Sequence, residues 1–255
     1  MTITFLGTGT SQGVPVIACN CEVCTSADAR DARLRTSILM EDKGKVIVID
    51  SGPDFRYQML RAGVQRLDAI VFTHEHKDHI AGLDDIRAFN YRQQAAIDVY
   101  ADLRVQEALK REFIYIFAEF KYPGIPQLTL HTIGHEPFNI GHVNFTPIEV
   151  LHYKLPVLGF RVNDFTYITD AKTVSDEEKE KIKGTKILVI NALQKQEHIS
   201  HFTLDEAIAF AKEIGAEKTY LTHISHRLGL HQDIDAELPR GIELAYDGLQ
   251  LEIDD

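Results

Sequence analysis

Residues 67–79, LDAIVFTHEHKDH, join an apolar run to a dense group of possible metal ligands. The first six residues predict a buried strand, and the last six carry three histidines, a glutamate and an aspartate. Imidazole nitrogens and carboxylate oxygens suit Zn²⁺, Mn²⁺ or Fe²⁺. His74 and His76 can face one ion while Asp78 and His79 face a second, so two adjacent ions use this set better than one does. The alternative is a polar helix start, capped by Asp78, with solvent-exposed histidines.

More possible ligands follow other apolar runs. Asp50, Asp170 and His223 each come directly after one, and His152 ends another. The carboxyl ends of strands in an α/β sheet meet at one rim, where ligands collect. This recurrence favours a metal site over an exposed helix start, and Asp50 is a candidate either to orient a ligand histidine or to cap the helix that follows.

Apolar runs alternate with amphipathic segments, which predicts an α/β fold in one domain over residues 1–255. We expect strands at 3–6, 45–49, 67–72, 143–148, 186–190 and 218–221. We expect helices at about 54–62, 79–89, 103–118, 175–183 and 203–214, and hairpin-like pairs of strands between about 128 and 168. Thr203 is a candidate cap of the last helix, which Gly215 closes.

In their order along the chain, these possible ligands resemble the signature of the metallo-β-lactamase-fold hydrolases. The matching residues are His74, His76, Asp78, His79, His152, Asp170 and His223. The resemblance covers essentially the whole chain and implies a four-layer αββα sandwich with a dinuclear site at one sheet edge. It implies one ion held by His74, His76 and His152, another held by Asp78, His79 and His223, and Asp170 as the bridge between them. His76 stands where the flavin-linked di-iron oxygen reductases carry a glutamate, which excludes that branch, and a β-lactamase proper is disfavoured.

The three cysteines of the chain, Cys19, Cys21 and Cys24, lie within six residues. Three thiolates are one short of a tetrahedral zinc site, so a fourth ligand must come from elsewhere. His226, in the sequence THISH, is our first candidate and His231 our second. The alternatives are inert thiols and an iron–sulfur cluster, although a cluster usually takes a fourth cysteine.

The cysteine cluster restricts the resemblance to one branch of the metallo-β-lactamase-fold hydrolases. It occurs here together with GTGTSQGVP (residues 7–15), a histidine at 201, THISH (222–226) and LPRGIELAYDG (238–248). This combination resembles the phosphoribosyl 1,2-cyclic phosphate phosphodiesterases of the carbon–phosphorus lyase pathway and their relatives; the glyoxalase branch lacks the cysteines. The resemblance implies a structural zinc on Cys19, Cys21, Cys24 and His226, and a His201 beside the phosphate.

We therefore expect a metal-dependent hydrolase, a phosphodiesterase for small cyclic or nucleotide-like phosphodiesters, with two divalent ions in its active site. Zinc or manganese is the expected metal, and iron is the alternative. Two such ions clamp a phosphodiester and activate water. Asp170 and Asp78 would hold the ions, and His201 would hydrogen-bond the phosphate or act as general acid. The competing functions are an RNA-processing nuclease, a lactonase and a non-catalytic metal-binding protein.

Charge and hydropathy restrict the partners. The formal net charge is −11, from 27 Lys and Arg against 38 Asp and Glu, which argues against binding a long nucleic acid. No apolar run is long enough for a membrane span, and the N-terminus lacks a secretory signal, so we expect a cytoplasmic protein.

The aromatic stretch 113–122 favours core packing over a pocket cover or a homodimer contact. Residues 7–13 favour a tight turn past the metal site over a phosphate loop, and Arg33 and Arg35 either meet an anionic substrate or lie at the surface.

Overall fold

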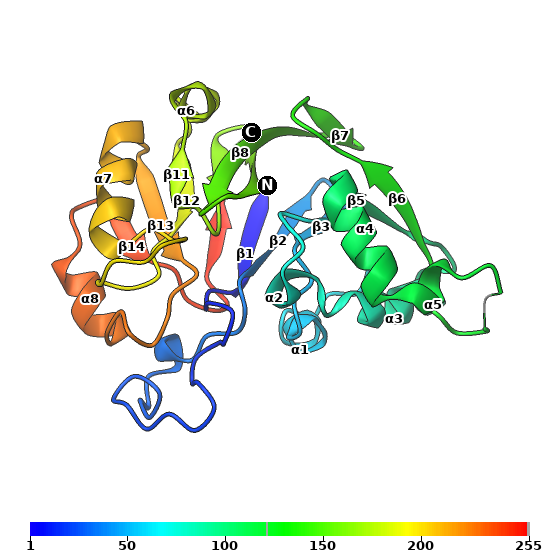
Figure 1. Ribbon diagram of the computed structural model, residues 1–255, viewed down its shortest axis with the longest axis horizontal. Helices are drawn as coiled ribbons and strands as arrows, with labels where there is room; N and C mark the ends of the chain where they lie inside the picture. Colours follow the sequence, from blue (N-terminus) through cyan, green and yellow to red (C-terminus); the bar gives the residue numbers. More distant parts are fainter. Residues whose placement is uncertain (121, 254–255) are drawn as a thin grey trace.

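The computed structural model describes residues 1–120 and 122–253. Two β-sheets pack face to face and helices cover the outer face of each, so the chain forms four αββα layers (Figure 1). The predicted fold class is confirmed. No helix within the described residues has the length and apolar character needed to cross a membrane.

The first sheet has seven strands in the described residues, in the order β15-β1-β2-β3-β4-β5-β6. They are β1 (Thr2–Gly7), β2 (Ser37–Asp42), β3 (Lys45–Ile49), β4 (Ala69–Val71), β5 (Ile97–Ala101), β6 (Leu128–Thr132) and β15 (Gln250–Glu252). Strands β3 to β6 run parallel. Side chains alternate between faces along a strand, so Ile47 and Ile49 of β3 enter the core between the sheets, whereas Val46 and Val48 pack under the helices.

The second sheet has the order β11-β8-β9-β10-β12-β13-β14 over the part of the chain that the structure describes, and β7 pairs with β8. The bounds are β7 (Phe138–Ile140), β8 (Val143–His152), β9 (Leu155–Val162), β10 (Phe165–Tyr167), β11 (Thr173–Val174), β12 (Ile187–Asn191), β13 (Lys218–Thr222) and β14 (Ile242–Leu244). The antiparallel β7, β8, β9 and β10 are the predicted hairpin region, although β6 at its start joins the first sheet instead.

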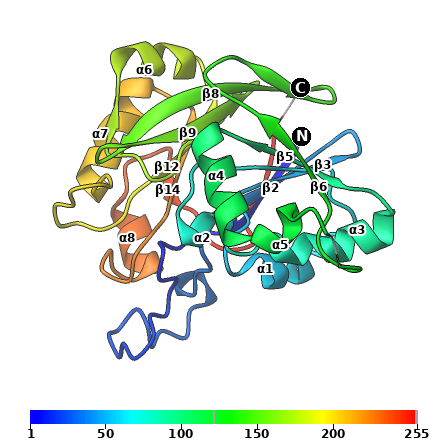
Figure 2. The same cartoon turned by 45° about the vertical axis from the view of Figure 1, so that its right-hand side comes forward.

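The helices flank both sheets, as the rotated view shows (Figure 2). They are α1 (Phe55–Arg61), α2 (Lys77–Ile80), α3 (Arg87–Gln93), α4 (Leu103–Glu112), α5 (Ile114–Phe117), α6 (Asp176–Ile182), α7 (Leu204–Ile214) and α8 (His231–Glu237), with 3-10 turns η1 (Ala29–Asp31) and η2 (Leu83–Ile86). Helix α7 has the predicted cap, because Thr203 and Glu206 form a capping box. Gly215 ends that helix with a left-handed φ of 72°.

Two predicted helices were wrong in extent. The predicted helix 79–89 is divided into α2, η2 and α3, because the chain turns at Gly82 to pack against Gly52. A β-carbon at Gly82 would lie 2.1 Å from the Gly52 carbonyl oxygen, so only glycine permits this approach. The predicted helix 103–118 breaks at Phe113, whose φ of −119° and ψ of 45° are not helical.

The parallel strands deliver polar residues to one edge of the sandwich. Strand β3 leads into Asp50, β4 into His74, β10 into Asp170 and β13 into His223. Because the neighbouring pairs β3–β4 and β12–β13 are parallel, their carboxyl ends lie at the same edge of each sheet. A backbone hydrogen bond of 3.1 Å, from the Leu158 amide to the Thr73 carbonyl, links the two sheets beside this edge.

Candidate metal centres

Three strand-end residues of this edge have a left-handed backbone. Their φ angles are 65° for Asp50, 58° for Asp170 and 56° for His223. This conformation costs a residue other than glycine about 1–3 kcal/mol and persists where the surrounding structure fixes it. All three side chains are buried, and Asp50 and Asp170 both contact His79.

Asp170 lies at the middle of the resulting cluster. Its Oδ2 is 3.3 Å from His79 Nε2 and 3.2 Å from His223 Nδ1, and Asp78 Oδ2 is 3.2 Å from the same His79 nitrogen. The donor atoms of His74, His79 and Asp170 lie within 4.8 Å of one another. This is the spacing expected of side chains that share one or two ions.

The remaining members of the predicted set lie on the other side of Asp170. The His76 ring is 4.6 Å from the His74 ring and 5.2 Å from that of His152, centroid to centroid. Donor atoms of His152, Asp170 and His201 again lie within 4.8 Å of one another. The structure therefore brings all seven predicted ligands and His201 into one cluster.

Each of four histidines uses one ring nitrogen on a protein partner, which leaves the other ring nitrogen for the cluster. His79 Nδ1 donates to Asp50 Oδ2 at 2.7 Å, and His152 Nδ1 donates to the Ser200 carbonyl at 2.9 Å. The other two contacts are His74 Nδ1 to Thr73 Oγ1 at 3.0 Å and His223 Nε2 to Thr10 Oγ1 at 3.1 Å. Such outer partners fix the tautomer and orientation of metal-binding imidazoles.

The Asp50 carboxylate accepts several of the hydrogen bonds that hold the first-sheet side of the cluster. It accepts from the Thr73 amide and hydroxyl at 2.9 and 2.8 Å, besides His79. The orienting role predicted for Asp50 therefore agrees with its contacts, whereas capping does not: Asp54 is the N-cap residue of α1. Thr10 and Thr73 were not predicted as partners, because a threonine beside a histidine in space leaves no trace in sequence spacing.

The cluster fits divalent cations. Nε2 of His74 is buried without a hydrogen-bond partner among the described residues, and Nε2 of His79 faces the carboxylates of Asp78 and Asp170 at 3.2 and 3.3 Å. A buried polar atom left unpaired is costly, and a bound cation would satisfy His74 Nε2. Imidazole and carboxylate donors, each held by an outer partner, form the donor chemistry of zinc, manganese and iron sites.

The electrostatics match a site built for positive charge. Burial, followed by the neighbouring His79, holds the pKa of His74 well below its usual value. Burial opposes protonation of His79 too, but the carboxylates of Asp78, Asp170 and Asp50 outweigh it and raise its pKa. Burial also opposes ionisation of Asp170, yet His223 and His79 lower its pKa well below the usual range. A cation would replace the proton of His79.

His201 has no hydrogen-bond partner for its Nδ1 among the described residues, and that atom lies 3.8 Å from Asp170 Oδ1. Its ring is 4.4 Å from the His152 ring and 4.8 Å from the His223 ring. Burial and then the adjacent His223 lower the pKa of His201 to about 2, so the neutral imidazole is the resident form. Its free nitrogen faces the cluster from the side of β8 and β13.

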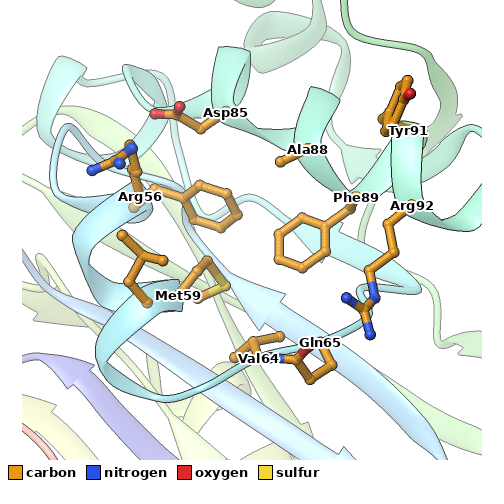
Figure 3. A pocket seen from close by; sticks show the side chains of 11 residues that line it. Arg56, Met59, Val64, Gln65, Asp85, Ala88, Phe89, Tyr91 and Arg92 are labelled. Carbon is orange, nitrogen blue, oxygen red and sulfur yellow. The ribbon is translucent and has the colours of Figure 1, made fainter.

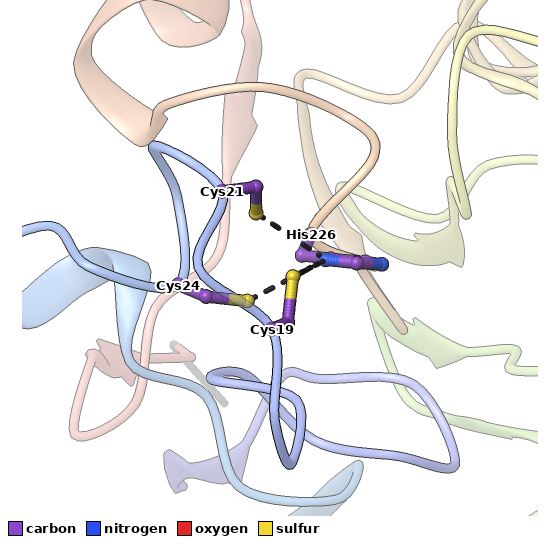
Figure 4. Close-up of side chains that lie close together, drawn as sticks. All are labelled: Cys19, Cys21, Cys24 and His226. Atoms are coloured by element: carbon purple, nitrogen blue, oxygen red, sulfur yellow. Dashed lines mark hydrogen bonds between the residues drawn. The ribbon is translucent and has the colours of Figure 1, made fainter.

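The cysteines form a second, separate cluster (Figure 4). The Sγ atoms of Cys19, Cys21 and Cys24 lie 3.3, 3.4 and 3.4 Å from His226 Nδ1. Zn–S bonds of ~2.3 Å and a Zn–N bond of ~2.05 Å at the tetrahedral angle place S and N ~3.5 Å apart, so this group fits zinc. A hydrogen bond from the Cys24 backbone lowers the pKa of Cys21 to about 6, which makes it a thiolate, the metal-binding form.

His231, the second candidate for this site, was wrong. Its Nδ1 accepts from Arg33 Nη2 at 3.0 Å and its amide donates to Asp31. Arg33 is 3% exposed and also donates to Thr8 Oγ1. Both predictions for Arg33, a surface position and contact with an anionic substrate, were therefore wrong. Arg35 pairs with Asp54.

The aromatic stretch 113–122 packs into the core only in part. Phe113 and Ile116 are buried, whereas Ile114, Phe120 and Tyr122 are 71%, 84% and 73% exposed. Lys121 lies outside the described residues. The predicted core packing is therefore wrong for most of the stretch.

A cavity of about 710 Å³ between α1 and α3 lies apart from both clusters (Figure 3). Its lining includes the apolar side chains of Phe55, Met59 and Phe89 and the basic side chains of Arg56 and Arg92. It contains none of the clustered donors.

Fold and donor cluster together define a domain of the metallo-β-lactamase class. Residues 45–224 match the family described as Beta-lactamase superfamily domain. A solved structure described as a new diphosphatase from the PhnP family is 41% identical, with a TM-score of 0.93 over 99% of this chain and 98% of that chain. This chain belongs to the beta-lactamase superfamily and, within it, to the PhnP family.

Other relatives are more distant or longer. An octanoyltransferase of Porphyromonas gingivalis is 41% identical over 258 residues, which are 100% of this chain but 52% of that protein. A ribonuclease Z of Nostoc is 26% identical over 64% of this chain and 46% of that protein. This chain spans about half the length of these curated relatives. The short form of human tRNase Z shares the fold, with a TM-score of 0.72 at 20% identity over the full length of both chains.

Proposed function

We propose that this protein is a dinuclear metal-dependent phosphodiesterase that hydrolyses small, cyclic or nucleotide-like phosphodiesters such as a phosphoribosyl cyclic phosphate. One observation carries the proposal: six histidine and aspartate side chains surround a seventh predicted ligand, Asp170, with Nε2 of His74 and Nε2 of His79 aimed into the cluster. The PhnP-family diphosphatase supports phosphorus–oxygen chemistry, because it is similar to this chain over the whole domain.

In this proposal His74, His76 and His152 hold one ion, and Asp78, His79 and His223 hold the other. Asp170, whose Oδ2 is close to both His79 and His223, would be a ligand of both ions. The ions, when bound, polarise the phosphoryl oxygens and lower the pKa of water. We propose zinc or manganese, with iron as the other candidate, and a structural zinc on the three cysteines and His226.

The chain's own residues orient the reaction. Asp50 and Thr73 fix the His74 and His79 rings, so the ligand set is arranged before substrate arrives. His201 presents a neutral, unpaired imidazole beside Asp170, suited to hydrogen-bond a phosphate oxygen. Because the pKa of His201 is low, action as the general acid requires that it take up a proton as the anionic substrate binds.

The alternatives differ in what they need from the surface. An RNA-processing nuclease, the activity named for the ribonuclease Z relatives, needs a basic path for the backbone, whereas the chain carries a net charge of −11. A lactonase would use the same ligands on a carbonyl carbon. A non-catalytic metal-binding protein would have no need of an unpaired His201 beside the ligands. The octanoyl transfer named for the P. gingivalis relative belongs to a chain about twice as long, and we do not extend it to this domain.

We also propose a small-molecule partner rather than a long nucleic acid or a membrane, and action in the cytoplasm. The exposed Ile114, Phe120 and Tyr122 support a homodimer. Light scattering of the purified protein tests this state; a monomer at all concentrations would exclude it.

A substrate panel followed by phosphorus NMR tests the function. Ribose cyclic phosphates, cyclic nucleotides, short RNA and lactones are offered to the metal-loaded protein at equal concentration. We expect turnover of the small cyclic phosphodiesters, with one new phosphomonoester resonance. Turnover of RNA alone would contradict the proposal and favour an RNA-processing nuclease. Turnover of lactones alone would favour a lactonase.

A further inference from the structure

Residues 8–36 leave the first sheet between β1 and β2 and form an irregular excursion, here called the brace. The brace contacts the segment that carries His223. The Ile224 amide donates to the Thr8 carbonyl at 2.9 Å, and the Thr10 amide donates to the Ile224 carbonyl at 3.1 Å. Between these backbone contacts, Thr10 Oγ1 lies 3.1 Å from His223 Nε2.

The same short segment supplies a residue to each cluster. His223 faces Asp170, and His226, three residues later, lies among Cys19, Cys21 and Cys24 (Figure 4). The cysteines belong to the brace, so the zinc-binding group joins the far end of the brace to the His223 segment. The segment is thus held at both ends, by Thr8 and Thr10 on one side and by the cysteines on the other.

Buried polar contacts hold the base of the brace. Arg33 donates to Thr8 Oγ1 and to the Ala245 carbonyl, and Asp247 accepts from the amides of Thr8 and Leu34. The base therefore has a fixed position on the first sheet. Displacement of His223 from its left-handed conformation would have to break contacts with this fixed part of the chain.

We propose that the zinc-closed brace positions His223 as a ligand of the dinuclear site, and that Thr10 is its point of contact. Thr10 Oγ1 holds the ring with Nδ1 of His223 facing Asp170, and when Nδ1 binds a cation the Nε2 hydrogen donates to this hydroxyl. Thr10 is a positioning residue in this account, and the cysteine site supports metal binding at the active site as well as the fold. The inference rests on the proposed dinuclear site.

Thr10→Val tests the contact with little change in shape. The control is Thr25→Val, in the same brace, because the Thr25 hydroxyl donates only to the carbonyls of Cys21 and Glu22. Competition with a chelator measures the affinity of each active-site ion, and elemental analysis measures the structural zinc. We expect one ion to bind about 10–100-fold more weakly in Thr10→Val, with the other ion and the zinc unchanged. Thr25→Val should bind all ions as the wild type does.

Cys21→Ala is the second test variant, and it acts through the cysteine site. It should lose the structural zinc and weaken the same ion that Thr10→Val weakens, and circular dichroism of the variant establishes that it is folded. Unchanged affinity for both ions in Thr10→Val overturns the inference, whatever Cys21→Ala does. If the wild type binds no ion outside the cysteine cluster, the proposed function fails first and this inference fails with it.

Discussion

The two donor clusters of this protein are built in opposite ways. The cysteine cluster takes three ligands from six consecutive residues of an irregular loop, and its members are partly buried. The histidine–aspartate cluster collects its ligands from strand ends across both sheets, and His74, His79, Asp170 and His223 are each 0–2% exposed. A set of four ligands that closes a tetrahedron is typical of a structural zinc, whereas a larger open set is typical of a catalytic site.

The difference lies also in the support around the ligands. Outer hydrogen bonds hold four histidines of the buried cluster, and Asp50, Asp170 and His223 keep a left-handed backbone there. In the cysteine cluster the side chains contact mainly one another and His226. These differences agree with the proposed roles of the two clusters, a catalytic site for the buried one and a structural site for the cysteines. The predictions below test this comparison.

The largest effect should come from Asp170, the residue common to both proposed ions. We expect Asp170→Ala to lower the hydrolysis of an activated bis-aryl phosphate by at least ~10³-fold and to release the active-site ions, because both lose a ligand. Zinc at the cysteines should stay. Kinetics and elemental analysis measure both quantities, and full activity in this variant would refute the dinuclear site.

His201→Ala should come next. Loss of a positioned imidazole beside the phosphate lowers kcat by about 10²–10⁴-fold, while the protein keeps both active-site ions. The metal content of this variant distinguishes two roles that the geometry permits for His201, contact with the phosphate and binding of a metal ion. If an ion leaves together with the activity, His201 is a ligand, as its position beside His152 and Asp170 would allow.

Asp50→Asn should have a smaller effect. The substitution keeps the shape but weakens the acceptor for His79 Nδ1 and for Thr73, so we expect about 10–100-fold weaker binding of the ion on His79. Chelator competition measures this change. An equal effect on the zinc at the cysteines would contradict the separation of the two clusters.

The smallest effect concerns the base of the brace. Burial and then Arg33 lower the pKa of His231 to about 4, below the ordinary value of 6.5. Between these values the unfolded chain binds the proton and the folded chain does not, so protonation favours the unfolded chain. The effect of His231 on the free energy of unfolding is therefore absent above pH 6.5, and stability falls as the pH decreases toward 4. His231→Asn should reduce this acid-induced decrease in Tm. A pH dependence identical to that of the wild type would exclude His231 as its source.

Local patterns in the sequence predicted the alternation of strands and helices and the histidine or aspartate at the strand ends. The four layers and the assignment of ligands to two ions were implied by the resemblance to the metallo-β-lactamase-fold hydrolases. The sequence did not predict where Arg33 and His231 lie, since both are buried by contacts with residues distant in sequence. Helix ends at Gly82 and Phe113 were missed for a similar reason: the first depends on a close approach to Gly52, and the second on a side chain that turns into the core. Thr10 and Thr73 act through space, so only the folded chain identifies them.

The most direct test is the metal content of the purified protein and of two variants. The wild type should hold three ions per chain, of which two leave in Asp170→Ala and one, the zinc, leaves in Cys21→Ala when the active-site metals are kept saturating. That pattern would establish two clusters with separate functions. A wild-type content near zero, or loss of the same ions in both variants, would contradict the account.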